Sequence, residues 1–345
     1  MKRIGVITGG GDCPGLNAVL RGIVLKAAMQ GIEVLGFRRG FQGLIDHGEY
    51  INLEYDDLED LMITGSTALR TSRTNPFAHK GGPQQIVYNL KRNGCEALIV
   101  IGGYNILSTT HQLAEKYGLK AVCVPKSAQN GVPETDFCFG FLSAVNYATE
   151  AIDRLHVTAS SYNRCLVIET TGQEVGWVAL YSGLGGGVHE ILIPEFPYNV
   201  TDVCNLVNKR KKEGKEYTLI AMAEGARPKN SGKFKAKTII KDEYGNDLIS
   251  GASEWLANQI RKKTGVDTRS VVLSAILRSG SPTNYDRILG LRFGEKAMAS
   301  AIEGKFGTMV SLKGTEIVSI PLKQAAGKIR TVPASLYKES RFFLI

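Results

Sequence analysis

Residues 2–22 read KRIGVITGGGDCPGLNAVLRG, and this stretch decides the fold class. Residues 2–8 form an apolar run that predicts a buried β-strand, and residues 9–15 are a glycine-rich loop. Residues 17–30 then carry apolar side chains at helical spacing until Gly31, which is typical of a helix end. A strand, a glycine loop and a helix in direct succession indicate an α/β protein that binds ligands at the carboxyl ends of its strands.

The same alternation continues along the chain. Apolar runs that predict strands are followed by glycine-bearing or polar loops at five further places, namely 32–37, 96–101, 119–124, 165–169 and 217–223. A helix is predicted after the second of these, from the 102–105 loop to residue 117. Such alternation predicts parallel sheets that are covered by helices on both faces. With 345 residues, the chain is expected to form two domains at roughly 150 residues per domain.

Composition excludes several classes of protein. No apolar run approaches the ~20 residues of a membrane helix, and the first strand leads into a glycine loop instead of a signal-peptide region. We therefore expect a cytoplasmic protein. The six cysteines form no Cys-x-x-Cys pair and are expected to be reduced and buried. The five histidines lack metal-ligand spacing, so no metal site is predicted.

The net charge of +9 is concentrated in three segments, 209–212, 227–241 and 261–263. The first and last are predicted to be polar faces of helices, and the middle one a surface segment that carries Gly and Lys. A nucleic-acid-binding protein would interleave aromatic residues with the basic ones or carry a recognisable motif. Since neither is present, we expect a phosphorylated small molecule as ligand and no nucleic acid.

Two interpretations of the glycine loop GGGDCPG, residues 9–15, remain open. Glycines between a strand and a helix let backbone amides approach phosphate oxygens closely, and the helix dipole adds positive potential. The loop is not a Gly-x-x-x-x-Gly-Lys-Ser/Thr motif and matches Gly-x-Gly-x-x-Gly only nearly. A tight structural turn would use the same glycines.

Several longer blocks in a fixed order resemble the 6-phosphofructokinase family. They are GGGDCPGLNAVLRG (9–22), GSTALRTSRTNPF (65–77), TDFCFGF (135–141), AVNYATEAIDRLHVTASS (144–161), MAEG (222–225), DTRSVVL (267–273) and RSGSPTNYDR (278–287). The details look most like the bacterial branch, which contains both ATP-dependent and pyrophosphate-dependent enzymes.

This resemblance implies two Rossmann-like three-layer α/β domains with parallel sheets and an active site between them. The larger, which would bind the nucleotide or pyrophosphate donor, would comprise residues 1–140 plus 277–327. The smaller, which would bind the sugar phosphate, would comprise residues 141–276 plus 328–345. The family also implies a homotetramer in which substrate contacts cross a subunit boundary; a dimer, or a hetero-oligomer with an active paralogue, is a further possibility.

On the sugar-phosphate side, the family pattern is partly retained. The resemblance assigns Arg164 and Arg269 from a neighbouring subunit, Arg278 at the 6-phosphate and Glu224 at a sugar hydroxyl. Guanidinium groups suit phosphate because their forked donors bind two oxygens at once. The family's Met-Gly-Arg segment is replaced here by Thr171 and the two residues after it, and the family's histidine by Ala275. For each arginine, a surface or interface salt bridge is the alternative.

On the donor side, the resemblance places Gly11, Arg73 and Gly103 near the phosphates, with Lys126 at the start of the catalytic loop. Where the family has an acid linked to magnesium, this chain has Tyr104. A phenol does not replace a carboxylate beside Mg²⁺, which takes hard anionic oxygen ligands.

The catalytic loop departs most from the family. Residues 125–131 read PKSAQNG, which places Gln129 at the position of the aspartate that accepts the proton of the attacking sugar hydroxyl. Gly131 stands at the position of a second acid. A glutamine amide cannot hold that proton, and general base catalysis contributes about 10²- to 10⁴-fold.

Two functions are therefore weighed. The first is a non-catalytic or regulatory paralogue of a glycolytic kinase that binds a sugar phosphate, a nucleotide or both, with no catalytic residue intact. The alternative is an active or slow phosphotransferase that uses magnesium and either ATP or pyrophosphate on fructose 6-phosphate or a related sugar phosphate. In that case Glu134 or Asp136 would supply a carboxylate, or Asp12 would hold a metal ion through water.

Overall fold

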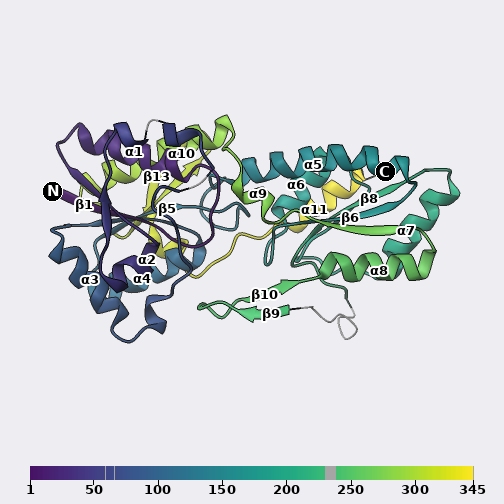
Figure 1. The fold of residues 1–345 in the computed structure, drawn as a ribbon, viewed down its shortest axis with the longest axis horizontal. Coiled ribbons are helices and arrows are strands. Elements are labelled where there is room, and N and C mark those ends of the chain that lie inside the picture. Colours follow the sequence, from purple (N-terminus) through teal and green to yellow (C-terminus); the bar gives the residue numbers. More distant parts are fainter. Residues whose placement is uncertain (59, 66, 230–237, 345) are drawn as a thin grey trace. The chain divides into compact units, whose positions relative to one another are not determined.

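The computed structural model describes residues 1–58, 60–65, 67–229 and 238–344 (Figure 1). The chain divides into two compact units. Unit 1 comprises Met1–Ser143, Asp242–Gly245 and Arg278–Ile329, and unit 2 comprises Ala144–Lys241, Asn246–Leu277 and Arg330–Ile345. The turn Asp242–Gly245 belongs to unit 1, which the sequence did not predict. The assignment of a donor domain and a sugar-phosphate domain stays a prediction.

Unit 1 is built on a seven-stranded sheet. Its strand order is β13-β12-β5-β4-β1-β2-β3. The bounds are β1 Arg3–Thr8, β2 Glu33–Phe37, β3 Tyr50–Asn52, β4 Leu98–Gly102, β5 Ala121–Pro125, β12 Thr308–Lys313 and β13 Glu316–Pro321. Strands β4 and β5 are buried along their whole length, because helices cover both faces of the sheet.

The predicted parallel pairing is confirmed for the central strands of unit 1, and only the two edge strands are antiparallel. Strands β1, β2, β4, β5 and β12 pair in parallel, whereas β3 is antiparallel to β2 and β13 is antiparallel to β12. Lys313 pairs with Glu316, so only two residues connect β12 to β13. A connection this short can join only antiparallel strands.

Helices cover the sheet of unit 1 on both faces (Figure 1). Helices α1 and α10 lie on one face and α2, α3 and α4 on the other. Their bounds are α1 Leu16–Ala28, α2 Gly40–Asp46, α3 Gly82–Arg92, α4 Tyr104–Tyr117 and α10 Asn284–Ile302. The apolar residues of α1 recur at helical spacing and are buried, as the sequence predicted.

Unit 2 is a smaller three-layer α/β unit. Its sheet has the order β11-β6-β8-β7, and all of its strands are parallel. The strands are β6 Cys165–Thr170, β7 Glu190–Leu192, β8 Thr218–Ala223 and β11 Thr268–Val272. Unit 2 contains the helices α6 Trp177–Gly185, α7 Val200–Lys212, α8 Ala252–Thr264 and α11 Ala334–Ser340. Two helices cross the division of the chain: α5 Phe141–Ser161 begins in unit 1, and α9 Ile276–Ser279 ends in unit 1. Strands β9 Thr238–Lys241 and β10 Asp247–Ser250 form a separate hairpin.

The cysteines and the basic segments follow the predictions in most respects. All six cysteines are buried, and none of them forms a disulfide. The 209–212 and 261–263 clusters lie on α7 and α8, which confirms them as helix faces. Part of the third basic segment, residues 230–237, lies outside the described residues, and residues 238–241 form β9.

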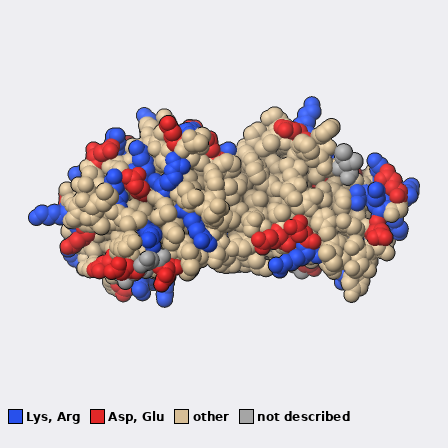
Figure 2. All heavy atoms as spheres, turned by 90° about the horizontal axis from the view of Figure 1, so that it is seen from above, with Lys and Arg blue, Asp and Glu red and all other residues tan. Residues whose placement is uncertain are grey.

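The distribution of charge agrees with solvated faces. On the face that Figure 2 shows, basic and acidic side chains are interspersed and form no continuous basic stripe. Within the described ranges, none of the helices is both long and apolar enough to cross a membrane.

Candidate functional site

Three loops lie side by side at the carboxyl edge of the sheet in unit 1. The glycine loop follows β1, the Gly103 turn follows β4, and the 125–131 loop follows β5. Gly9 N donates to Ile101 O at 2.9 Å, and Lys126 N donates to Gly102 O at 3.0 Å. The three loops adjoin because β1 pairs with β4 and β4 pairs with β5.

Lys126 lies beneath the glycine loop and supports it. Its side chain is buried, and Nζ donates to Gly9 O at 2.6 Å and to Gly11 O. Burial, with a smaller contribution from the nearby Arg73 and Arg278, lowers the pKa of Lys126 to about 8. This lysine therefore titrates close to neutral pH, directly under the loop.

The glycine loop has only part of its backbone available to a ligand. Gly10 has a φ of 86°, a left-handed backbone conformation that residues other than glycine rarely adopt. Its amide donates to Ser72 O at 2.8 Å, and Thr71 Oγ1 donates to Gly10 O at 2.6 Å. The amides of Gly11 and Asp12, by contrast, donate to no group in the described part of the chain. A ligand oxygen can therefore be bound at the second half of the loop.

Two guanidinium groups face that half of the loop. A methyl group on Gly11 would lie 3.6 Å from Arg73 Nη2 and 3.9 Å from Arg278 Nη1. Arg278 Nη1 also forms an ion pair with Asp12 Oδ1 at 2.8 Å. Arg73 is exposed and makes no ion pair within the described ranges. We call Gly11, Asp12, Arg73, Lys126 and Arg278 together the glycine-loop cradle.

The residues around the cradle do not fit a magnesium site. Asp12 carries the only carboxylate in residues 9–15, 102–106 and 125–131, and Arg278 already neutralises it. Gly103 and Tyr104 begin α4 without adding an acid. Among the described residues, no group of three or more His, Cys, Asp or Glu side chains could hold a metal ion. Mg²⁺ takes anionic oxygen ligands, and this set offers too few.

The polar residues of the 125–131 loop hold the loop itself in shape. Ser127 Oγ accepts from the amides of Gln129 and Gly131, each at 3.2 Å. Asn130 has a positive φ of 55°, and its buried Oδ1 accepts from Cys138 N at 3.0 Å. Asx and Ser/Thr turns of this kind fix loop conformation. The half-buried Gln129 is thus held on an ordered loop.

Glu134 and Asp136 do not return a carboxylate to this loop. Glu134 pairs with Lys313 at 3.5 Å, and Asp136 Oδ2 accepts from Gly314 N at 2.6 Å. Both partners lie at the turn between β12 and β13, on the side of β5 away from β1. These two acids therefore stabilise the hairpin turn.

In unit 2, two of the predicted arginines meet at one carboxylate. Arg164 Nη2 lies 3.4 Å from Asp267 Oδ2, and Arg269 Nε lies 3.1 Å from Asp267 Oδ1. The guanidinium of Arg164 also lies over the Tyr162 ring, 4.1 Å from its centroid. In this structure they are salt-bridged, as the alternative interpretation described. Their role toward a sugar phosphate stays a prediction.

Glu224, also in unit 2, is surrounded by donors. Its carboxylate accepts from Gly172 N at 3.1 Å and, at 3.4 Å each, from the hydroxyls of Thr171 and Ser274. Ser274 was not predicted as a site residue; it precedes Ala275 in the chain. These contacts orient the acid, and its predicted contact with a sugar hydroxyl remains to be tested.

The low pKa of Lys126 leads to a measurable proton uptake. A dianion bound at the cradle favours the charged form of Lys126 and raises its pKa. Calorimetric titration with sulfate at pH 8, in buffers of different ionisation enthalpy, should show uptake of up to about half a proton per site. At pH 6 the lysine is already charged, so uptake should vanish. Equal uptake at both pH values would show that another group titrates.

The fold and these loops define an α/β protein whose candidate ligand site lies at the carboxyl edge of a parallel sheet. The chain matches the model of the family described as phosphofructokinase over residues 3–301. It therefore belongs to the phosphofructokinase family, which confirms the resemblance seen in the sequence.

Individual relatives are similar over their whole length. The chain is 45% identical over 343 residues to the pyrophosphate–fructose 6-phosphate 1-phosphotransferase of Amycolatopsis mediterranei, with 99% of each chain covered. It is 41% identical over 332 residues to an ATP-dependent 6-phosphofructokinase of Corynebacterium efficiens, which covers 96% of this chain and 95% of the relative.

A solved structure supports the fold. The pyrophosphate-dependent phosphofructokinase from Nitrosospira multiformis has a TM-score of 0.85 at 20% identity and covers 100% of this chain and 92% of its own. At this identity the likeness shows the fold alone. It confirms the predicted α/β class.

Proposed function

We propose that this chain binds the phosphoryl groups of a small phosphorylated ligand at the glycine-loop cradle, without the base-assisted transfer of its family. The observation that carries the proposal is the composition of the three adjoining loops. The loops contribute Lys126 and the single carboxylate of Asp12, and Arg73 and Arg278 approach Gly11 from neighbouring segments. By the sequence resemblance, Gln129 would stand at the position of the family's proton acceptor.

The electrostatics favour an anion. Lys126 is buried beneath Gly11, while Arg73 and Arg278 approach the same glycine from outside. Arginine binds phosphate with paired, charge-assisted hydrogen bonds, and the amides of Gly11 and Asp12 add donors in the loop that precedes α1. A phosphoryl group with two negative charges would attract Arg278 more strongly than the singly charged carboxylate of Asp12 does.

The chemistry of the loop argues against rapid transfer. A sugar hydroxyl that attacks a phosphoryl group must lose its proton, and Gln129 can only accept a hydrogen bond from it. Glu134 and Asp136, which could have supplied a base, are engaged with the β12–β13 turn. We expect the protein to act as a regulatory or sensing member of its family.

Phosphoryl transfer to fructose 6-phosphate is the second candidate. The names of the relatives favour it more directly than they favour a non-catalytic protein, since both are called phosphotransferase or kinase. The transition state of phosphoryl transfer is loose, so positioning and cationic groups contribute much of the catalysis. A slow enzyme could therefore work from the cradle without a base on the loop.

Isothermal titration calorimetry with pyrophosphate, ATP and fructose 6-phosphate tests the binding function. Saturable binding of pyrophosphate or ATP that weakens with added salt is expected from a cationic site. The absence of saturable binding for all three ligands would overturn the proposal. Sedimentation velocity of the same samples would test the proposed dimer, tetramer or hetero-oligomer.

The variant Asp12→Asn distinguishes a site that binds an anion directly from a site that binds it through a metal ion. In the variant Asp12→Asn, pyrophosphate affinity without magnesium should rise about 2- to 5-fold, because a negative charge near the anion is removed. The control is Glu33→Gln, which removes an acid that is paired with Arg3 elsewhere in unit 1. If magnesium is added and the affinity of Asp12→Asn is then tenfold or more below that of the unmodified chain, this acid holds the ligand through the cation and the anion-only site is wrong.

A further inference from the structure

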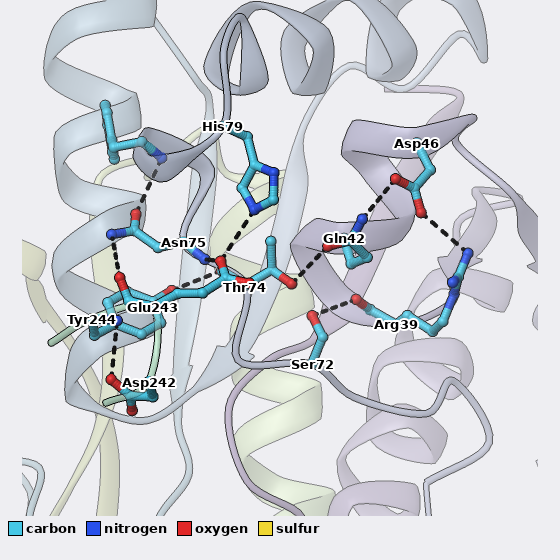
Figure 3. A network of polar contacts seen from close by, with 11 residues as sticks. Arg39, Gln42, Asp46, Ser72, Thr74, Asn75, His79, Asp242, Glu243 and Tyr244 are labelled. Carbon is cyan, nitrogen blue, oxygen red and sulfur yellow. Dashed lines mark hydrogen bonds and ion pairs between the residues drawn. The ribbon is translucent and has the colours of Figure 1, made fainter. Parts of the chain in front are cut away.

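The residues on both sides of Arg73 are held by hydrogen bonds, whereas the Arg73 side chain makes none within the described ranges. On its N-terminal side, Thr71 and Ser72 are hydrogen-bonded to Gly10, and Ser72 Oγ also donates to Arg39 O at 2.7 Å (Figure 3). The Arg73 side chain itself makes no hydrogen bond within the described ranges. The segment therefore presents one unpaired guanidinium to the glycine loop.

On the C-terminal side of Arg73, the turn Asp242–Gly245 completes the support (Figure 3). Tyr244 Oη donates to Thr74 O at 2.9 Å, and Asn75 N donates to Glu243 Oε2 at 2.8 Å. Thr74 Oγ1 donates to Gln42 Oε1 at 2.9 Å. These bonds fix the backbone immediately after the arginine.

The turn Asp242–Gly245 is itself held in place by packing and by an ion pair. Tyr244 is half-buried and packs against the hydrophobic core of unit 1. Burial raises the pKa of Tyr244 to about 12, so its hydroxyl remains a donor at neutral pH. His79 Nε2 lies 3.1 Å from Glu243 Oε2 and ties the same turn to the far end of the segment.

We propose that the turn Asp242–Gly245 is a positioning element for Arg73, and that Tyr244 and Glu243 set the anion affinity of the cradle without touching the anion. When an arginine binds an anion, both its side chain and its backbone lose conformational freedom, and this loss weakens binding. A backbone that is already fixed before binding reduces the loss. The turn lies about 170 residues away in sequence from the segment that it holds. This inference rests on the proposed anion-binding function.

The test is a double-mutant cycle on pyrophosphate affinity. Tyr244→Phe removes the bond to Thr74 O but keeps the ring, and should weaken pyrophosphate binding by about 2- to 10-fold. In an Arg73→Ala background the same change should have no further effect, since the group that it positions is gone. Tyr88→Phe is the matched control, because Tyr88 is exposed on α3 and makes no hydrogen bond among the described residues.

Hydrogen exchange provides a second measurement that needs no ligand. The amides of Asn75 and Phe77 should exchange faster in Tyr244→Phe than in the unmodified chain or in Tyr88→Phe. If exchange is unchanged, or if Tyr244→Phe weakens binding equally with and without Arg73, the positioning role is wrong. If the unmodified chain does not bind pyrophosphate at all, the proposed function fails and this inference fails with it.

Discussion

The double substitution Gln129→Asp with Tyr104→Asp is expected to raise the rate of phosphoryl transfer to fructose 6-phosphate by about 10²- to 10⁴-fold. Transfer would be measured with magnesium and either pyrophosphate or ATP. Aspartate at position 129 would supply the missing proton acceptor on a loop that Ser127 and Asn130 already hold in shape. Aspartate at position 104 would add an anionic oxygen at the start of α4, next to that loop.

The matched control is Gln129→Asn with Tyr104→Asn. Asparagine has the size of aspartate but cannot take up a proton, so the control should stay at the rate of the unmodified chain. The single variants should each give a smaller gain than the double variant. If the double variant folds, binds pyrophosphate and still shows no gain, the proposal that these two loops limit transfer is wrong.

Arg73→Ala is expected to lower the affinity of the chain for pyrophosphate by about 10- to 100-fold. One hydrogen bond between charged groups typically contributes about 1.5 to 3 kcal/mol, which corresponds to about 10- to 100-fold in affinity. Stability should be unaffected, because the Arg73 side chain is exposed and makes no hydrogen bond within the described ranges. Calorimetry at two salt concentrations measures the effect.

Arg38→Ala is the control for Arg73→Ala. Arg38 is also exposed in unit 1, but it lines a cavity of about 360 Å³ beside β3, at the edge of the sheet. Its removal lowers the net charge equally, so a comparable loss of affinity would indicate a general charge effect. A loss confined to Arg73→Ala would support a local contact with the anion.

The central strands could be predicted from the sequence, whereas the hairpins could not. The apolar runs behind β1, β4, β5, β6 and β8 are fully or almost fully buried, and burial on both faces is what such runs predict. Strands β13 and β9, in contrast, lie in hairpins at or outside the sheet edges, where polar residues are tolerated and the pattern is weak.

The site was only partly predictable for a related reason. The position of Lys126 after β5 and that of Gly11 after β1 follow from strand order, because loops at one sheet edge must lie together. The support of Arg73 by Tyr244 depends on a turn about 170 residues away, and no local pattern encodes it. The ion pair between Glu134 and Lys313 could not be predicted for the same reason, because Lys313 lies at the distant β12–β13 turn.

Steady-state phosphoryl transfer by the unmodified chain tests the central claim most directly. The assay would use fructose 6-phosphate, magnesium and either pyrophosphate or ATP, with the Amycolatopsis mediterranei relative measured in parallel. We predict turnover at least several hundredfold below that of the relative, from the missing base alone. Turnover equal to that of the relative would contradict the account and establish the chain as an ordinary phosphotransferase of its family.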